Sequence, residues 1–130
     1  MTRITVVNDN ADFLELMKEI LEDERYESTT IDGDRPDALD RIRASRPDLL
    51  MIDVRLGIDG AHGWDVAKQV RHEPEFRGLP ILLCCSDPFA AGELKDELEV
   101  THAVQTLSKP FSIDQLDAAI ERLLGDTAVR

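Results

Sequence analysis

Five short apolar runs alternate with segments of helical periodicity along the chain. The runs at 49–53 and 80–85 are almost unbroken, which is typical of strands buried on both faces. The run at 4–7 is shorter, the run at 103–108 is another short candidate strand, and the run at 26–31 is more polar, as expected near a sheet edge. We therefore expect five strands at these positions.

Helical periodicity is clearest near the two ends of the chain. Apolar residues over 13–21 recur at the spacing of one helix face, and this pattern predicts a helix that begins near Asn10 or Ala11. Ser112 and Gln115 form an S-x-x-Q capping box, in which each residue satisfies a backbone N–H of the other. A final helix is expected to follow this box.

Weaker patterns predict three more helices. Asp34 is expected to cap the first of them, with Pro36 in its opening turn. An apolar stripe over 66–70 indicates a second helix that ends before Pro74, and the segment 89–98 is a poor helix.

The alternation of strand and helix predicts an α/β fold. Such chains form a doubly wound parallel sheet, with right-handed crossovers that place helices on both faces. We expect a five-stranded sheet in the flavodoxin-like order 2-1-3-4-5. The sequence divides into one domain at 1–125 and a tail at 126–130, with Gly125 as the stop of the last helix.

Composition narrows the possible functions. A chain of 130 residues with 42% hydrophobic content can bury the core of one domain. A net charge of -12 disfavours direct nucleic-acid binding, which needs clustered Lys and Arg. Cys84 and Cys85 are adjacent in an apolar run, so they are expected to be core thiols of a protein in the reducing cytoplasm. No membrane span is expected.

Charged side chains stand at the ends of three predicted strands. Asp9 follows the first strand, Asp53 ends the third, and Lys109 follows the fifth. In the order 2-1-3-4-5 the carboxyl ends of these strands open into one crevice. Two carboxylates and one ammonium group are therefore expected to converge there.

This combination suits phosphoryl chemistry. Mg²⁺ is commonly held by one or two carboxylates, with water and phosphate oxygens completing its shell, and Asp9 and Asp53 meet that minimum. A carboxylate such as Asp53 can become an aspartyl phosphate when a metal ion and a fixed cation such as Lys109 offset the incoming charge. Lys109 precedes Pro110, where a cis bond is inexpensive and could aim the lysine inward.

The chain resembles the receiver domain of two-component response regulators along nearly its whole length. The matching segments are Val6-Val7-Asn8-Asp9, Leu50-Met51-Ile52-Asp53, Gly63-Trp64-Asp65-Val66, Pro80-Ile81-Leu82-Leu83 and Lys109-Pro110-Phe111.

The resemblance implies a role for several residues. It implies that Asp53 accepts a phosphoryl group from a histidine kinase or phosphotransfer protein. It places Mg²⁺ at Asp9, Asp53 and the backbone carbonyl of Arg55. It also implies that a Ser or Thr at the end of strand four senses the phosphoryl group, and that a downstream protein, or a second copy in a homodimer, reads the change.

The chain departs from the family pattern at several positions. Asn8 stands where the family usually has the first member of an acidic pair. It is expected to contact the metal ligands rather than the metal, and the loss of one negative charge is expected to weaken Mg²⁺ binding. Cys85 occupies the usual Ser or Thr position, with Ser86 next to it as the alternative phosphoryl contact. Thr106 stands at the aromatic switch position.

Three functions remain open from the sequence. The first is a single-domain receiver that is phosphorylated on Asp53 and signals by protein–protein interaction, without being a turnover enzyme. The second is a pseudo-receiver, an interaction module in which Asn8 and Cys85 have removed regulated phosphorylation. The third is a small phosphatase with Asp53 as nucleophile, which is disfavoured because the sequence offers no separate general acid. His62 is expected to be a solvated loop residue, and Trp64 to pack beneath that loop.

Overall fold

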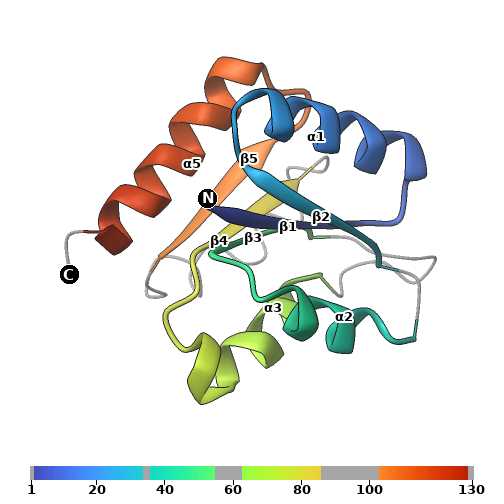
Figure 1. Ribbon diagram of the computed structural model, residues 1–130, viewed down its shortest axis with the longest axis vertical. Helices are drawn as coiled ribbons and strands as arrows, with labels where there is room; N and C mark the ends of the chain where they lie inside the picture. Colours follow the sequence, from blue (N-terminus) through green and yellow to red (C-terminus); the bar gives the residue numbers. More distant parts are fainter. Residues whose placement is uncertain (1, 34–35, 55–62, 86–102, 129–130) are drawn as a thin grey trace.

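The computed structural model describes residues 2–33, 36–54, 63–85 and 103–128, with side chains described as far as Gly125. Within these residues five strands form one parallel sheet in the order β2-β1-β3-β4-β5 (Figure 1). The predicted fold class and strand order are confirmed. The strands are β1 (Arg3–Asn8), β2 (Glu27–Asp32), β3 (Leu49–Asp53), β4 (Ile81–Cys85) and β5 (Val104–Ser108).

Helices cover both faces of this sheet, as Figure 1 shows: α1 and α5 pack on one face, and α2 and α3 on the other. In the described part of the chain, no helix combines the length and the apolar character that crossing a bilayer requires. The helices are α1 (Ala11–Asp23), α2 (Ala38–Ser45), α3 (Gly63–His72), the 3-10 helix η1 (Pro74–Phe76) and α5 (Ile113–Ala128).

Two apolar cores separate the helices from the sheet. One core joins α1 and α5 to side chains such as Val6 and Met51, and the other joins α2 and α3 to side chains such as Val7 and Ile52. All residues of β3 and β4 are buried, because alternate side chains enter opposite cores. The continuous apolar runs of the sequence are explained by this two-sided burial.

The register of the sheet sets where the functional groups lie. Val7 of β1 pairs with Ile52 of β3, and Asp53 pairs with Cys84 of β4. The carboxyl ends of the central strands therefore finish at one edge. This is the edge at which doubly wound folds place their binding sites.

Local capping confirms the predicted starts of the first and last helices. Asn10 caps α1 by accepting a hydrogen bond from the backbone N–H of Phe13 at 3.1 Å. At α5 the capping box is complete: the Ser112 N–H donates to Gln115 Oε1 at 2.8 Å, and the Gln115 N–H donates to Ser112 Oγ at 3.1 Å.

Two predicted helix limits are wrong. Pro36 is not in the first turn of α2, because the helix begins at Ala38 with Asp37 as N-cap. That start places Ala38 and Ile42 one turn apart on the buried face, so packing rather than the proline sets the helix limit. Asp34, the predicted cap, lies outside the described residues, as does the segment 89–98.

Gly125 does not stop α5, which continues to Ala128. A helix-ending glycine normally adopts a left-handed conformation, and Gly125 has no positive φ. A glycine inside a helix costs only about 1 kcal/mol relative to alanine, so it weakens the helix without ending it.

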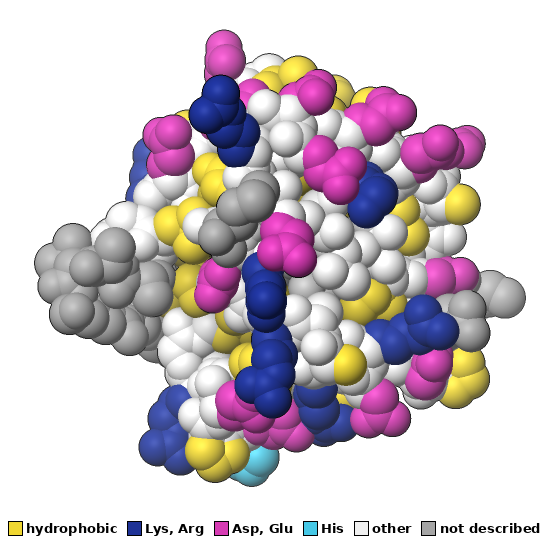
Figure 2. Space-filling model, in the orientation of Figure 1, with side chains coloured by type: hydrophobic (Ala, Val, Ile, Leu, Met, Phe, Trp, Pro, Cys, Tyr) yellow, Lys and Arg dark blue, Asp and Glu magenta, His cyan; other side chains and the backbone are white. Residues whose placement is uncertain are grey.

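Acidic side chains are spread over the part of the surface formed by α1 and α5, as Figure 2 shows when it is compared with Figure 1. This distribution agrees with the net charge of -12. The surface charge favours solubility and does not by itself select a ligand.

Candidate functional site

Asp53 is a buried carboxylate at the end of β3, with 7% of its surface exposed. Lys109 Nζ donates to its Oδ2 atom at 2.6 Å, and Asn8 Nδ2 donates to the same oxygen at 3.0 Å. Burying a carboxylate is costly unless cations and hydrogen-bond donors replace its hydration shell. The three side chains come from β1, β3 and the residue after β5, and the order of the sheet brings them together.

Lys109 is held at this edge by its backbone as well as its side chain. Its N–H donates to the carbonyl oxygen of Cys85 at 2.8 Å, which extends the β4–β5 ladder by one residue. The Lys109–Pro110 peptide bond is cis. The ammonium group points inward to Asp53, and 23% of the lysine side chain remains exposed.

Asn8 is almost fully buried and uses both ends of its carboxamide. Its Nδ2 group donates to Asp53, and its Oδ1 atom accepts from the Asn10 N–H at 2.8 Å. An ionised acidic residue at this position could not donate to Asp53 and would repel it instead. Asn8 therefore ties the pocket to the start of α1.

Gly63 explains how α3 begins so close to the pocket. Its N–H donates to the Val54 carbonyl oxygen at 2.9 Å. A Cβ atom at Gly63 would lie 1.7 Å from the backbone oxygen of Asp53, a distance that no side chain can occupy. Only glycine fits here, because the backbone of α3 contacts the backbone at the end of β3 directly.

The two cysteines are free thiols in opposite cores. Cys84 faces the core under α1 and α5, and Cys85 faces the core under α2 and α3. Burial raises the pKa of the Cys84 thiol to about 12, because an apolar environment disfavours the thiolate. The prediction that both are core residues is confirmed. Cys85 also ends β4, opposite Ser108 of β5, and so it borders the pocket edge.

Of the remaining residues singled out from the sequence, the structure describes Asp9, Thr106 and Trp64. Asp9 directly follows β1 and is exposed, and Thr106 is an exposed residue of β5. Trp64 is buried in the core under α2 and α3, which confirms that it packs, whereas residues 55–62 of the loop it was expected to support lie outside the described residues. Arg55, His62 and Ser86 lie outside the described residues.

The contact between Phe13 and Lys109 was not predicted from the sequence. The spacing placed Phe13 on the buried face of α1, and the side chain does pack, partly buried, against the core under α1 and α5. Its ring also lies under the lysine ammonium, with 4.4 Å between Nζ and the ring centroid. Phe111 meets the same ring edge-to-face, at 6.4 Å between centroids and 89° between planes. Two aromatic residues in the sequence could have indicated this contact. Phe13 lies in the first turn of the helix that follows β1, and Phe111 follows Lys109 and Pro110.

An apolar groove adjoins this lysine. It encloses about 320 Å³ between α1 and the start of α5, and its wall includes Lys109 and Phe13. Leu16 and Ile113, which also line it, are 52% and 50% exposed. Among the described residues these are the large hydrophobic side chains left open to solvent.

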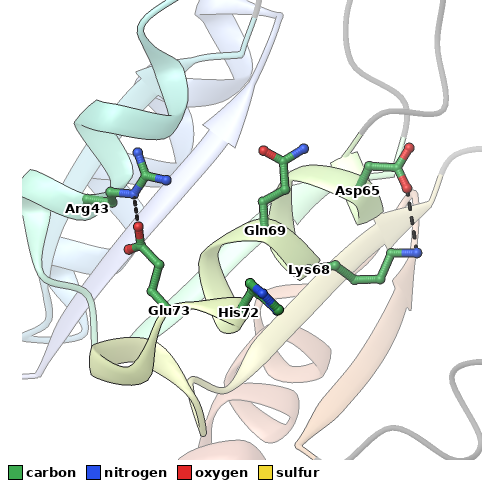
Figure 3. Close-up of a pocket in the computed structure, with 6 residues that line it drawn as sticks. All are labelled: Arg43, Asp65, Lys68, Gln69, His72 and Glu73. Atoms are coloured by element: carbon green, nitrogen blue, oxygen red, sulfur yellow. Dashed lines mark ion pairs between the residues drawn. The ribbon is translucent and has the colours of Figure 1, made fainter.

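A second hollow lies on the opposite side of the sheet, between α2 and α3, and is shown in Figure 3. Its charged groups pair with one another: Arg43 Nε lies 2.5 Å from Glu73 Oε1, and Lys68 Nζ lies 3.6 Å from Asp65 Oδ1. The side chains that line this hollow project from the surface of the helical layer, and none of them comes from the end of a strand. The hollow is lined by Arg43, Asp65, Lys68, Gln69, His72 and Glu73.

The donor set at the Asp53 edge fits Mg²⁺. Asp9 and Asp53 would supply hard carboxylate oxygens, and Mg²⁺ usually takes one or two carboxylates and keeps several waters. Within the described ranges no group of three or more His, Cys, Asp or Glu side chains gathers as a metal cluster.

The model of the response regulator receiver domain family matches residues 4–121 of this chain. The chain belongs to this family. The polar-differentiation response regulator DivK of Brucella anthropi is 28% identical over 124 residues, which cover 95% of this chain and 96% of the relative. DivK of Brucella ovis is 26% identical over 95% of this chain and 96% of its own.

Solved receiver structures share the fold. A putative response regulator from Chloroflexus aurantiacus has a TM-score of 0.77 at 28% identity, covering 95% of this chain and 98% of that one. The chemotaxis response regulator CheY4 of Vibrio cholerae has a TM-score of 0.78 at 23% identity, with the same coverage.

The receiver domain of the sensor histidine kinase PA1611 from Pseudomonas aeruginosa is described with a magnesium ion coordinated in its active-site cleft. Its TM-score is 0.75 at 22% identity, covering 95% of this chain and 98% of that one. Receiver domains are signalling modules of two-component systems rather than turnover enzymes, and they bind Mg²⁺ in the active site.

Proposed function

We propose that this receiver domain accepts a phosphoryl group on Asp53 in a Mg²⁺-dependent step. The donor would be a histidine kinase or a phosphotransfer protein, and the phosphorylated domain would signal by binding a downstream protein. The observation that carries the proposal is the buried Asp53 carboxylate with the Lys109 ammonium at 2.6 Å and the Asn8 amide at 3.0 Å. Such preorganised donors offset charge as it develops during transfer.

In the proposed step an Asp53 oxygen attacks the phosphorus of the donor. An O–P bond forms, the P–N bond to the donor imidazole breaks, and the leaving imidazole nitrogen takes up a proton from solvent water. Lys109 moves from the carboxylate to the phosphoryl oxygens, so the cation stays with the migrating charge. Asp9, Asp53 and the carbonyl of Arg55 would hold the Mg²⁺, which supplies further charge neutralisation.

The sensing part of the proposal concerns the ends of β4 and β5. Cys85 borders the pocket and would contact the phosphoryl group as a weak thiol donor, with Ser86 as the stronger hydroxyl donor beside it. Thr106 would take the switch position on β5. A small side chain there has less surface to bury than an aromatic one, so we expect a small conformational response.

Recognition of a protein donor would use the rim around Lys109. A donor must bring its phosphohistidine to Asp53, and the apolar groove with the exposed Leu16 and Ile113 begins at Lys109.

We place the receiver domain at 1–125, with a tail at 126–130 whose residues to Ala128 continue α5. We expect the protein to work in the cytoplasm, where these kinases and their partners meet.

Intact mass measurement tests the proposal. The protein is incubated with phosphoramidate and Mg²⁺, and the expected result is a gain of one phosphoryl group that is lost in Asp53→Asn and after removal of Mg²⁺ with a chelator. No gain by a folded protein would overturn the proposal and favour the pseudo-receiver. Phosphate release over many turnovers would favour the phosphatase.

A further inference from the structure

We propose that Phe13 is a positioning residue, whose ring holds the Lys109 ammonium over Asp53 for phosphoryl transfer. The inference rests on the proposed function of Asp53 and adds a residue that the sequence analysis assigned to the core. Its basis is the 4.4 Å distance between Lys109 Nζ and the Phe13 ring centroid, within the roughly 6 Å range of a cation–π interaction.

Phe13 belongs to a closed ring of contacts around the pocket. Asp53 Oδ2 accepts from Asn8 Nδ2, and Asn8 Oδ1 accepts from the Asn10 N–H. Asn10 Oδ1 then accepts from the Phe13 N–H, and the Phe13 ring contacts Lys109, which returns to Asp53. Each member is fixed by the next one, so the position of the ammonium depends on the first turn of α1.

The ring itself has little freedom to move away. Phe13 lies in the capped first turn of α1, and Phe111 contacts it edge-to-face from the residue after Pro110. Edge-to-face aromatic pairs are favoured beyond the burial of their surface. The aromatic surface under Lys109 is therefore rigid before any phosphodonor binds.

Phosphoryl transfer makes this contact useful. In the resting pocket the Asp53 carboxylate attracts the ammonium, but its charge passes to the phosphoryl oxygens as the new bond forms. The lysine side chain is 23% exposed, so it can turn to solvent once that attraction weakens. The face of Phe13 attracts the ammonium throughout the reaction, which keeps it aligned at the moment when it is needed.

The test compares Phe13→Leu with Phe13→Trp in phosphorylation by phosphoramidate at saturating Mg²⁺. Leucine keeps an apolar side chain and removes the π face, and we expect the rate constant to fall about fivefold, the effect of one partly exposed cation–π contact. Tryptophan has the strongest π face, and we expect it to restore at least half of the lost rate. Phe76→Leu, the same change in the opposite core, is the matched control and should leave the rate unchanged.

A second readout separates positioning from mere packing. The ring current of Phe13 should shift the Lys109 ε-methylene proton resonance upfield, and this shift should vanish in Phe13→Leu and persist in Phe76→Leu. The Mg²⁺ dissociation constant, measured by calorimetry, should stay within twofold of the parent value in Phe13→Leu. An equal rate loss in Phe13→Leu and Phe13→Trp, or an unchanged rate in Phe13→Leu, would overturn the inference.

Failure of the inference is distinguishable from failure of the proposed function. If the parent protein gains no phosphoryl group, the function of Asp53 is refuted, and the positioning role falls with it. If the parent protein is phosphorylated and Phe13→Leu reacts at the parent rate, only the role of Phe13 is refuted.

Discussion

Two charged clusters, one at the carboxyl edge of the sheet and one between α2 and α3, show how the surroundings of an ion pair determine its effect on stability. At the carboxyl edge, Lys109 and Asp53 lie 2.6 Å apart, and their side chains are 23% and 9% exposed. Between α2 and α3, Arg43 and Glu73 lie 2.5 Å apart, and their side chains are 36% and 33% exposed. The distances are alike, but the environments differ.

The difference lies in what would happen if one partner were removed. Water can solvate the remaining member of the Arg43–Glu73 pair, so such pairs contribute at most about 1 kcal/mol. Little water reaches Asp53, so its carboxylate depends on Lys109 and Asn8. A pair built on strand ends is thus restricted to one geometry, whereas a pair built on helix surfaces can rearrange.

The largest effect is expected for Lys109→Met. Methionine keeps much of the side-chain volume but removes the cation that would neutralise the phosphoryl group, and we expect phosphorylation by phosphoramidate to slow by about a hundredfold or more. The initial rate is measured by intact mass. Lys68→Met, which removes a lysine from the α2–α3 hollow, is the control and should react at the parent rate. Equal rates for the two variants would contradict the distinction.

A comparison of two glycines tests the packing behind the pocket. Gly63→Ala would force a Cβ atom against the backbone oxygen of Asp53, and we expect the free energy of unfolding to fall by about 3 kcal/mol. Urea denaturation measures the change. Gly125→Ala, where a Cβ atom meets nothing within 4 Å, should instead raise stability by up to about 1 kcal/mol. If Gly63→Ala left the free energy of unfolding unchanged, the result would show that α3 can move away from β3.

Asn8→Asp tests how an added negative charge in the Asp53 pocket changes Mg²⁺ affinity, compared with the same charge in the α2–α3 hollow. The substitution replaces a donor to Asp53 with a carboxylate, so we expect Mg²⁺ affinity to rise about tenfold, since a second nearby negative charge attracts the cation more strongly. Calorimetric titration measures the affinity. Gln69→Glu adds the same charge in the α2–α3 hollow and should change the affinity less than twofold. Weaker Mg²⁺ binding by Asn8→Asp would count against the site.

The smallest effect is expected for Glu73→Gln. Removing this half-buried partner of Arg43 should change the free energy of unfolding by less than about 1 kcal/mol, with the difference shrinking in high salt. The phosphorylation rate should not change. Urea denaturation at two salt concentrations checks the first expectation, and a loss of several kcal/mol would mean that the α2–α3 cluster depends on its pairing as strongly as the Asp53 pocket does.

Most of the fold was predictable because burial leaves a direct trace in sequence. The strands β3 and β4 are buried on both faces, so their apolar runs had only one good interpretation. The start of α2 and the end of α5 were mispredicted because Pro36 and Gly125 carry strong local signals. At the start of α2 the packing of Ala38 and Ile42 against the sheet outweighed the signal of Pro36. In α5 the backbone of Gly125 has no positive φ, so the helix continues through it.

The site was predictable in outline and not in its details. The order of the strands was enough to predict that Asp53 and Lys109 lie at the same edge of the sheet. The third side chain of that prediction was Asp9, whereas the neighbour that donates to Asp53 is Asn8. The donation from Asn8 to Asp53, and the ring of Phe13 under Lys109, depend on side-chain directions that sequence spacing does not specify. Gly63 was quoted as part of a motif, but the reason for a glycine there required the backbone contact itself.

The double attachment of Lys109 bears on how a signal could leave the pocket. Its side chain reaches Asp53, while its main chain is bonded to the last carbonyl of β4 at Cys85. A shift of the ammonium group must be absorbed either by side-chain torsions or by the backbone between these two strands. If the ring of Phe13 limits those torsions as proposed, a larger share of the displacement would fall on the main chain. The end of β4 would then respond to phosphorylation without a hydroxyl group at position 85.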